Sequence, residues 1–250
     1  MLLKNIKRII IILMSILTLT ACSYVGENIK HKISKSVNIA ENQNQKNLDF
    51  DEKESPDFYK IIGKVDESNL PDLQIGEIIY EGLDDLKRNQ SVKARLSYEN
   101  YKEGKQKRKD ISEFKPSGWV KNKIVRLKFY DGTIYNGHFY NRSHLLAHSL
   151  GGRDSIENLI TGTRPQNVGK NNQKGGMQYI ETKVLNWLKE NPKGYCYYIV
   201  TPKYNNHDLV PYIVEVEALS SDKTINEKVI IYNVAPNYEI DYSTGNYYEK

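Results

Sequence analysis

Residues 140–169 read YNRSHLLAHSLGGRDSIENLITGTRPQNVG, and residues 177–184 read MQYIETKV. The first segment follows an aromatic-rich stretch with strand character, and the second begins a run with helical periodicity. Together they contain an imidazole, two amides and a carboxylate that follow one another along the chain: His144, Asn158, Asn167 and Glu181. Such a set suits metal-assisted phosphodiester cleavage, because an imidazole takes a proton from water while oxygen ligands hold a hard cation. The segment therefore predicts an enzyme.

The pattern on either side predicts an α+β domain with a largely antiparallel central sheet. Apolar residues between Met177 and Leu188 recur at helical spacing, which predicts a helix over residues 176–191 that ends before Pro192. Residues 145–159 are expected to be irregular, and residues 83–88 to form a short helical or turn segment. Alternation and turn residues predict strands at 77–80, 92–98, 124–130, 133–140, 195–201, 212–218, 228–233 and 238–242.

The N-terminus has the composition of an export signal. Three basic residues precede an apolar run at 9–19 that is too short to span a bilayer comfortably. The run ends in Leu-Thr-Ala-Cys, which resembles a bacterial lipoprotein signal with Cys22 as the lipidated residue; a plain secretory signal is the alternative. We expect a signal peptide at 1–21, a lipidated cysteine with a flexible polar tether at 22–56, and one folded domain at 57–250.

Charge distribution says more about partners than net charge does. Loss of residues 1–21 would remove three basic residues and lower the formal charge from +5 to +2. A basic run at 105–109, with further basic residues beside Asn167, could still follow a polyanion backbone, although solvated loops are the ordinary alternative. The predicted substrate-binding residues are Arg108, Arg164 and Lys170. Cys196 lies in an apolar run and is expected to be a buried, inert thiol.

Each candidate residue has an ordinary structural alternative. His144 could be a satisfied structural histidine, but a neutral imidazole is one of the few groups able to accept a proton near pH 7. Arg142 is two residues away, so on a strand both side chains face the same way. Asn167 could cap a helix or ligate Mg²⁺ through its amide oxygen. Glu181 could be a solvated charge, yet no basic residue lies three or four positions away.

A second histidine spacing suggests a different enzyme class. His144 and His148 have the spacing of the two histidines of a zinc-protease helix, but the position after the first is Leu145 rather than glutamate. Gly151 and Gly152 would also end such a helix early. Proteolysis is therefore rejected.

The quoted segment resembles the DNA/RNA non-specific endonucleases of the ββα-metal (His-Me) finger superfamily, in their secreted streptodornase and DNA-entry nuclease branch. Two flanking motifs agree with it: KPSGW at 115–119 and YNVAPNYEIDYSTG at 232–245. The likeness covers residues 76–250. One departure is that the commonest quartet of the wider family is Asp-Arg-Gly-His, whereas this chain has Asn141 and Ser143 at the variable positions.

The resemblance implies a ββα-metal finger that carries the active site, and roles for its residues by position. His144 would be the general base, Asn167 the direct Mg²⁺ ligand, and Glu181 the residue that orders metal-bound water. Asn158 would support the histidine loop or the metal shell, and Arg142 would face the phosphate. The implied activity is metal-dependent, sequence-non-specific hydrolysis of DNA or RNA to 5′-phosphate products, with Mn²⁺ able to replace Mg²⁺.

Taken together, the sequence predicts a monomeric nuclease without a protein partner, lipid-anchored through Cys22 at the extracellular face of the bacterial membrane or secreted. Two other classes stay open. A surface lipoprotein could bind nucleic acid without cleaving it, and a structural envelope lipoprotein would need none of these residues. The sequence leaves open the preference for DNA over RNA and for single over double strands.

Overall fold

A computed structural model describes residues 50–170 and 174–250. The predicted signal peptide, Cys22 and residues 22–49 of the predicted tether lie outside these ranges. The folded unit begins at Phe50, so residues 50–56 belong to it rather than to a tether. Phe50 stacks on Phe58 with ring centroids 5.3 Å apart, which ties this segment to the core. No helix within the described ranges is both long and apolar enough to cross a membrane.

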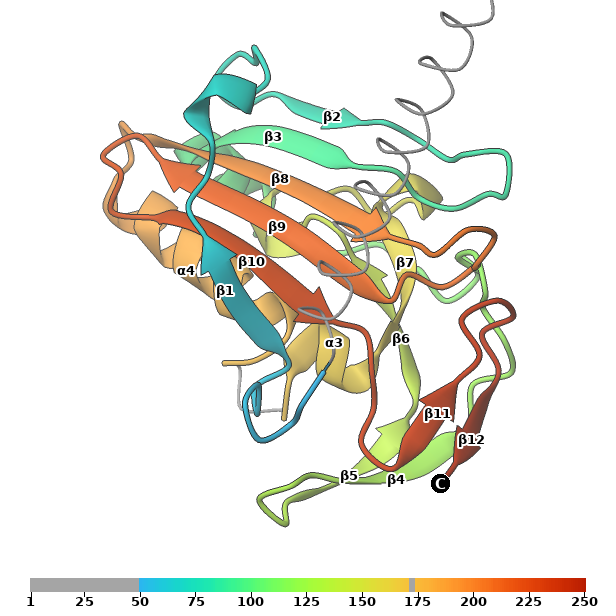
Figure 1. Ribbon diagram of the computed structural model, residues 1–250. Helices are drawn as coiled ribbons and strands as arrows, with labels where there is room; N and C mark the ends of the chain where they lie inside the picture. The colour runs from blue at the N-terminus through green and yellow to red at the C-terminus, as the bar shows by residue number, and fades with distance from the viewer. Residues whose placement is uncertain (1–49, 171–173) are drawn as a thin grey trace, which may run out of the picture. The chain divides into compact units, whose positions relative to one another are not determined.

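The centre of the described unit is an antiparallel sheet of six strands in the order β1-β10-β9-β8-β3-β2 (Figure 1). The strands are β1 (Tyr59–Gly63), β2 (Ile78–Tyr80), β3 (Val92–Ser97), β8 (Tyr195–Lys203), β9 (Ile213–Ser220) and β10 (Asn226–Tyr232). In β8, buried and partly exposed residues alternate along all nine positions, as expected for a strand with one covered face. The predicted α+β class with an antiparallel sheet is confirmed.

Helix α4 (Met177–Glu190) covers one face of this sheet, and β6 (Tyr140–His144) and β7 (Leu159–Thr163) lie on the same side (Figure 1). The apolar positions that predicted the helix are all buried: Met177, Ile180, Val184, Trp187 and Leu188. They join the apolar sheet residues and Leu145, Leu146 and Ile160 in one core. The helix ends at Glu190 with Asn191 as its C-terminal cap, just before Pro192, as predicted.

A second, aromatic core lies at one end of the unit, between the hairpins β4–β5 and β11–β12 (Figure 1). Phe139 stacks on Tyr247 with ring centroids 3.8 Å apart. The predicted turn between β4 and β5 forms at Gly132, whose φ is +83°, and the side chain of Asp131 accepts the backbone N–H of Thr133. The strands are β4 (Ile124–Lys128), β5 (Ile134–His138), β11 (Tyr238–Ile240) and β12 (Tyr247–Glu249).

Several elements differ from the expectation. The predicted strand at 133–140 is two strands: β5 pairs with β4, and after Phe139 the chain continues as β6 and pairs with β7. Residues 83–88 take the turn alternative of the prediction, and Leu83 forms an isolated bridge with Asn89. Elements that the sequence did not predict include β1, β7, β12, α2 (Tyr98–Glu103) and α3 (Arg164–Val168); short 3₁₀ turns lie at Glu67–Asn69, His148–Leu150 and Ile156–Asn158. Cys196 is buried as predicted, and burial raises the pKa of its thiol to about 12.

Candidate active site

The candidate site is built on the antiparallel pair β6–β7 followed by α3 and α4. His144, the last residue of β6, pairs with Leu159, the first residue of β7. Thr163 ends β7 and caps α3 by accepting the backbone N–H of Gln166 at 3.1 Å. Asn167 therefore lies within α3, a helix that the sequence did not predict, although a polar cap before Pro165 is an ordinary helix start.

Both flanking motifs hold this strand pair in place. Thr161 donates its hydroxyl hydrogen to the carbonyl of Ser117, in the KPSGW segment, at 2.8 Å. Asn233 of the C-terminal motif accepts the backbone N–H of Thr163 at 2.8 Å and donates to the carbonyl of Thr161 at 3.1 Å. Segments far apart in the sequence thus fix β7, and with it the register of β6 and the position of His144.

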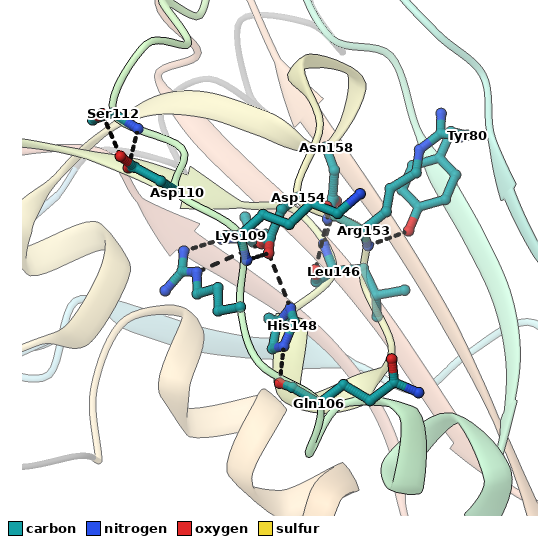
Figure 2. A network of polar contacts seen from close by, with 12 residues as sticks. Tyr80, Gln106, Lys109, Asp110, Ser112, Leu146, His148, Arg153, Asp154 and Asn158 are labelled. Carbon is teal, nitrogen blue, oxygen red and sulfur yellow. Dashed lines mark hydrogen bonds and ion pairs between the residues drawn. The ribbon is translucent and has the colours of Figure 1, made fainter.

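Asn158 closes the irregular loop after His144. Its side chain is fully buried; it accepts the backbone N–H of Leu146 and donates to the carbonyls of Leu146 and Arg153, each at 2.9 Å (Figure 2). The loop is so tight that a Cβ on Gly152 would lie 1.9 Å from the carbonyl oxygen of Leu146. Asn158 thus braces the loop that follows the imidazole.

The imidazole of His144 lies between Arg108 and Asp154. Its Nδ1 is 3.1 Å from Nη2 of Arg108, and its Nε2 is 2.9 Å from Oδ1 of Asp154. A guanidinium has only donors, so Nδ1 must carry the lone pair and Nε2 the hydrogen, which Asp154 accepts. Burial, with the charge of Arg108 as a second cause, lowers the pKa of His144 to about 4. The imidazole is therefore neutral at pH 7 and able to act as a base.

Asp154 was not predicted as a site residue. Its side chain is only 2% exposed, and its Oδ2 accepts the backbone N–H of Lys109 at 2.7 Å (Figure 2). Nδ1 of His148 lies 3.3 Å from the same oxygen. The hydrogen bonds from His144 and from the backbone of Lys109 outweigh the effect of burial and lower the pKa of Asp154. The only sequence signal was an aspartate after the Gly151-Gly152 turn, ten residues beyond His144.

Glu181 faces the same region from α4. Its carboxyl group is partly buried, and within the described ranges it takes part in neither a hydrogen bond nor an ion pair. Burial raises its pKa to about 8, against a lowering effect from Arg108. Arg108 therefore exerts an electrostatic effect on both His144 and Glu181. A recessed carboxylate without a protein partner suits a hydrated cation.

Asn167 is attached to β6 through Ser143, the neighbour of His144. Its Oδ1 accepts the hydroxyl hydrogen of Ser143 at 3.1 Å. An amide oxygen has two lone pairs, so this bond leaves one lone pair for a cation. Across the described ranges, no hydrogen bond links Asn167 to His144 or Glu181, and no cluster of three His, Cys, Asp or Glu side chains is arranged to hold a metal. The donors present therefore fit Mg²⁺ only as an ion that keeps most of its waters.

The guanidinium of Arg142 binds backbone carbonyls and an aromatic ring. Nε of Arg142 donates to the carbonyl of Phe114 at 2.6 Å, Nη2 donates to the carbonyl of Ser112, and the guanidinium lies 4.3 Å from the ring centroid of Trp119. The expectation that Arg142 faces a phosphate beside His144 does not match this arrangement, in which three of its neighbours come from segment 112–119. The guanidinium instead fastens that segment over β6.

Arg164 and Lys170 lie toward the β4–β5 hairpin. The guanidinium of Arg164 is 5.3 Å from the ring centroid of Tyr135, and the ammonium of Lys170 forms an ion pair with Asp131 at 2.8 Å. Of the three predicted substrate-binding residues, the structure thus places Arg108 at His144 and the other two at the hairpin.

A pocket of about 330 Å³ opens beside Asp154. Its charged and polar lining comes from residues before and after His144 in the sequence: Glu103, Gln106, Lys107, Lys109, His148, Arg153 and Asp154. Three of these side chains are cationic and two are anionic. The cationic side chains exceed the anionic ones by one, so the lining is only weakly positive, and Lys107, Lys109 and Arg153 are its groups able to contact phosphates.

Comparison with known proteins agrees with this geometry. The family model described as DNA/RNA non-specific endonuclease matches residues 77–249. A deoxyribonuclease from Streptococcus dysgalactiae subsp. equisimilis is 33% identical over 240 residues, which cover 77% of this chain and 73% of the relative.

Two solved structures extend the comparison to the fold. The Sda1 nuclease with a bound zinc ion superposes with a TM-score of 0.74 and 32% identity, over 81% of this chain and all of that chain. NucA from Streptococcus agalactiae with a magnesium ion bound gives a TM-score of 0.57 and 26% identity, over 75% of this chain and 83% of that chain. The resemblance predicted from the sequence is therefore confirmed, and the chain belongs to the DNA/RNA non-specific endonuclease family, whose enzyme class it shares.

Proposed function

We propose that this protein hydrolyses phosphodiester bonds of DNA, and of RNA as an alternative substrate, with His144 as general base and one hydrated Mg²⁺. The observation that carries the proposal is the state of the imidazole. It is neutral, its hydrogen is committed to Asp154, and its Nδ1 lone pair points to a cationic group that a phosphate can draw away. The relatives with Mg²⁺ or Zn²⁺ bound support a metal-dependent reaction.

The chain's own residues would divide the work as follows. Arg108 would leave Nδ1 for an oxygen of the scissile phosphate, because a charge-assisted bond to an anion is stronger than a bond to a neutral ring nitrogen. Nδ1 would then take a proton from water, and the resulting hydroxide would attack phosphorus. Displacement of the 3′ oxygen, which takes a proton from solvent, would leave a 5′ phosphate.

Asn167 and Glu181 are the residues we assign to the cation. Asn167 would contribute the second lone pair of its amide oxygen, and Glu181 would accept hydrogen bonds from metal-bound water. When bound, Mg²⁺ would supply positive charge to the phosphate and to the leaving oxygen. Mn²⁺, with similar ligand preference, would substitute. Asn158 would act through the loop that it braces, and Arg142 through segment 112–114, rather than on the substrate.

Arg164 and Lys170 would extend the contact with the nucleic acid backbone along the β4–β5 side. Lys170 would have to exchange its ion pair with Asp131 for a phosphate. Contacts of this kind read backbone rather than base edges, which supports cleavage without sequence preference.

Export and anchoring are part of the same proposal. The basic and apolar signal at 1–21 and the small residues before Cys22 support a lipid-anchored protein at the extracellular face of the membrane, or a secreted one. Incorporation of labelled palmitate that is lost on Cys22→Ala would support the anchor, and equal labelling of both proteins would refute it.

Plasmid cleavage tests the function. The protein is assayed with Mg²⁺, with EDTA, and as the variants His144→Ala and His207→Ala; His207 is an exposed histidine in a turn and serves as the matched control. We expect EDTA and His144→Ala each to lower the rate at least about 100-fold, consistent with loss of the base, and His207→Ala to cleave like the wild type. Cleavage that survives both EDTA and His144→Ala would refute the mechanism. Binding of DNA without cleavage by the wild type would favour the capture lipoprotein instead.

A further inference from the structure

Asp154 contacts the imidazole of His144 at Nε2 and Arg108 contacts it at Nδ1, and the position of the imidazole hydrogen follows from the two contacts. Arg108 can only donate, so it requires a lone pair on Nδ1; the carboxylate of Asp154 can only accept, so it requires a hydrogen on Nε2. The two demands agree. A neutral histidine in solution populates both tautomers, whereas this site selects one.

The carboxylate is itself held in one orientation. Oδ2 accepts the backbone N–H of Lys109 at 2.7 Å, while Oδ1 faces His144, so rotation of the carboxyl group would break both bonds. Its backbone lies in the loop that Asn158 closes through the carbonyl of Arg153. The side chain is 2% exposed, so water competes little for its oxygens. Asp154 is therefore a fixed acceptor rather than a mobile surface charge.

We propose that Asp154 is the positioning residue of the nuclease site: it accepts the Nε2 hydrogen of His144 and so makes Nδ1 the atom that receives the proton from water. This inference rests on the proposed function of His144 as base. When Nδ1 takes the proton, the ring becomes an imidazolium whose Nε2 hydrogen stays on Asp154. The carboxylate remains ionised and offsets the new positive charge, and the proton on Nδ1 later returns to solvent.

The same carboxylate has a second effect on the site. Through Lys109 it holds segment 106–109, which carries Arg108, across the imidazole, and Nε of Arg108 lies 3.5 Å from Oδ1. A purely structural aspartate would hold this segment without influencing the ring hydrogen. The two roles can be separated because acceptance of the Nε2 hydrogen sets the tautomer of His144, whereas the bond to the backbone of Lys109 does not.

The variants are Asp154→Asn, Asp154→Glu and the control Asp110→Asn. Asp110 is an exposed aspartate of the adjoining segment that accepts hydrogen bonds from Ser112, so its variant reproduces the loss of one negative charge. We expect Asp154→Asn to lower kcat about 100-fold with KM changed by less than about threefold, since an amide can present its N–H to Nε2 and favour the opposite tautomer. Asp154→Glu should recover at least about tenfold of that loss, because it restores a carboxylate acceptor.

Nitrogen-15 NMR of the histidine rings provides the readout that a structural role would not move. The wild type should show His144 with its hydrogen on Nε2, and Asp154→Asn should shift the ring toward hydrogen on Nδ1, while Asp110→Asn changes nothing. A wild-type ring with hydrogen on Nδ1 would overturn the inference without any variant. So would Asp154→Asn that is folded, keeps the Nε2 tautomer and retains kcat within about threefold. Full cleavage by His144→Ala would instead overturn the proposed function, and the tautomer measurement would still decide the role of Asp154.

Discussion

Substitution of Asn158 by alanine tests whether the loop after His144 is held by one side chain. Asn158 is fully buried and makes three hydrogen bonds to backbone groups, one accepted from Leu146 and two donated to Leu146 and Arg153. Alanine would leave one N–H and two carbonyls inside the protein without this partner. Each such group costs about 1–3 kcal/mol, so we expect a loss of at least about 3 kcal/mol in the free energy of unfolding.

For a folded unit of this size, that loss corresponds to a fall in Tm of about 6–12 °C. Thermal and urea unfolding of Asn158→Ala measure it, with Asn186→Ala as the matched control. Asn186 is exposed on α4 and its change to alanine should alter stability by no more than about 0.5 kcal/mol. Asn158→Asp adds a second comparison, because it keeps the volume but turns an acceptor toward two carbonyl oxygens. It should be at least as destabilising as alanine at pH 7 and recover as the pH is lowered.

A fall in Tm below about 2 °C for Asn158→Ala would refute the assignment of Asn158 as the brace of this loop. So would an Asn158→Asp variant as stable as the wild type at pH 7. In either case the loop would have to be held mainly by its backbone contacts, such as the bond from the N–H of Leu145 to the carbonyl of Asn158.

Two further predictions concern charge. In EDTA, the wild type should lose stability relative to Glu181→Gln as the pH rises from about 4.5 to 8. Over this range the folded carboxyl, with its raised pKa, holds a proton that the unfolded carboxyl has released. The free energies of unfolding of the two proteins should therefore diverge by about 2 kcal/mol, which is less than full linkage because the group is partly exposed. Stabilities of the two proteins that change in parallel with pH would refute the raised pKa of Glu181. Arg108→Ala should raise KM and reduce the slope of log KM against log salt by about 1, as expected for one lost phosphate contact, and an unchanged slope would place Arg108 outside the substrate path.

The elements with strong periodicity were predictable because one side of each is buried. Five apolar positions at helical spacing gave α4, and strict alternation gave β8. Strand β7 has no such alternation: all five of its residues are buried, since α3 covers it and the C-terminal motif braces it. Strand β1 is largely exposed at the sheet edge, and α2 depends on a local cap between Ser97 and Asn100. Burial that depends on tertiary contacts produces no periodic pattern in the sequence of the element itself.

The candidate site shows the same limit. The order of His144, Asn158, Asn167 and Glu181 was visible in the sequence because they lie in or beside one supersecondary unit. Arg108 is 36 residues from His144 and was identified only as part of a basic run, and Asp154 was missed, because the position of each at the imidazole depends on how two loops close. Strand alternation and the family resemblance both predicted that Arg142 faces the substrate, but segment 112–119 folds back over β6 and binds its guanidinium.

A single cation links the two perturbed groups of the site. Burial and, as a second cause, the charge of Arg108 lower the pKa of His144, and Arg108 also partly offsets the effect of burial on the pKa of Glu181. Arg108 itself is held near the imidazole by the bond between Asp154 and the backbone of Lys109. When a phosphate draws the guanidinium away, the lone pair of Nδ1 becomes accessible and the ring becomes more basic at the same moment, because a nearby positive charge has moved. In the proposed mechanism, the arrival of the substrate would therefore strengthen the base, through a residue that lies outside both β6 and α4.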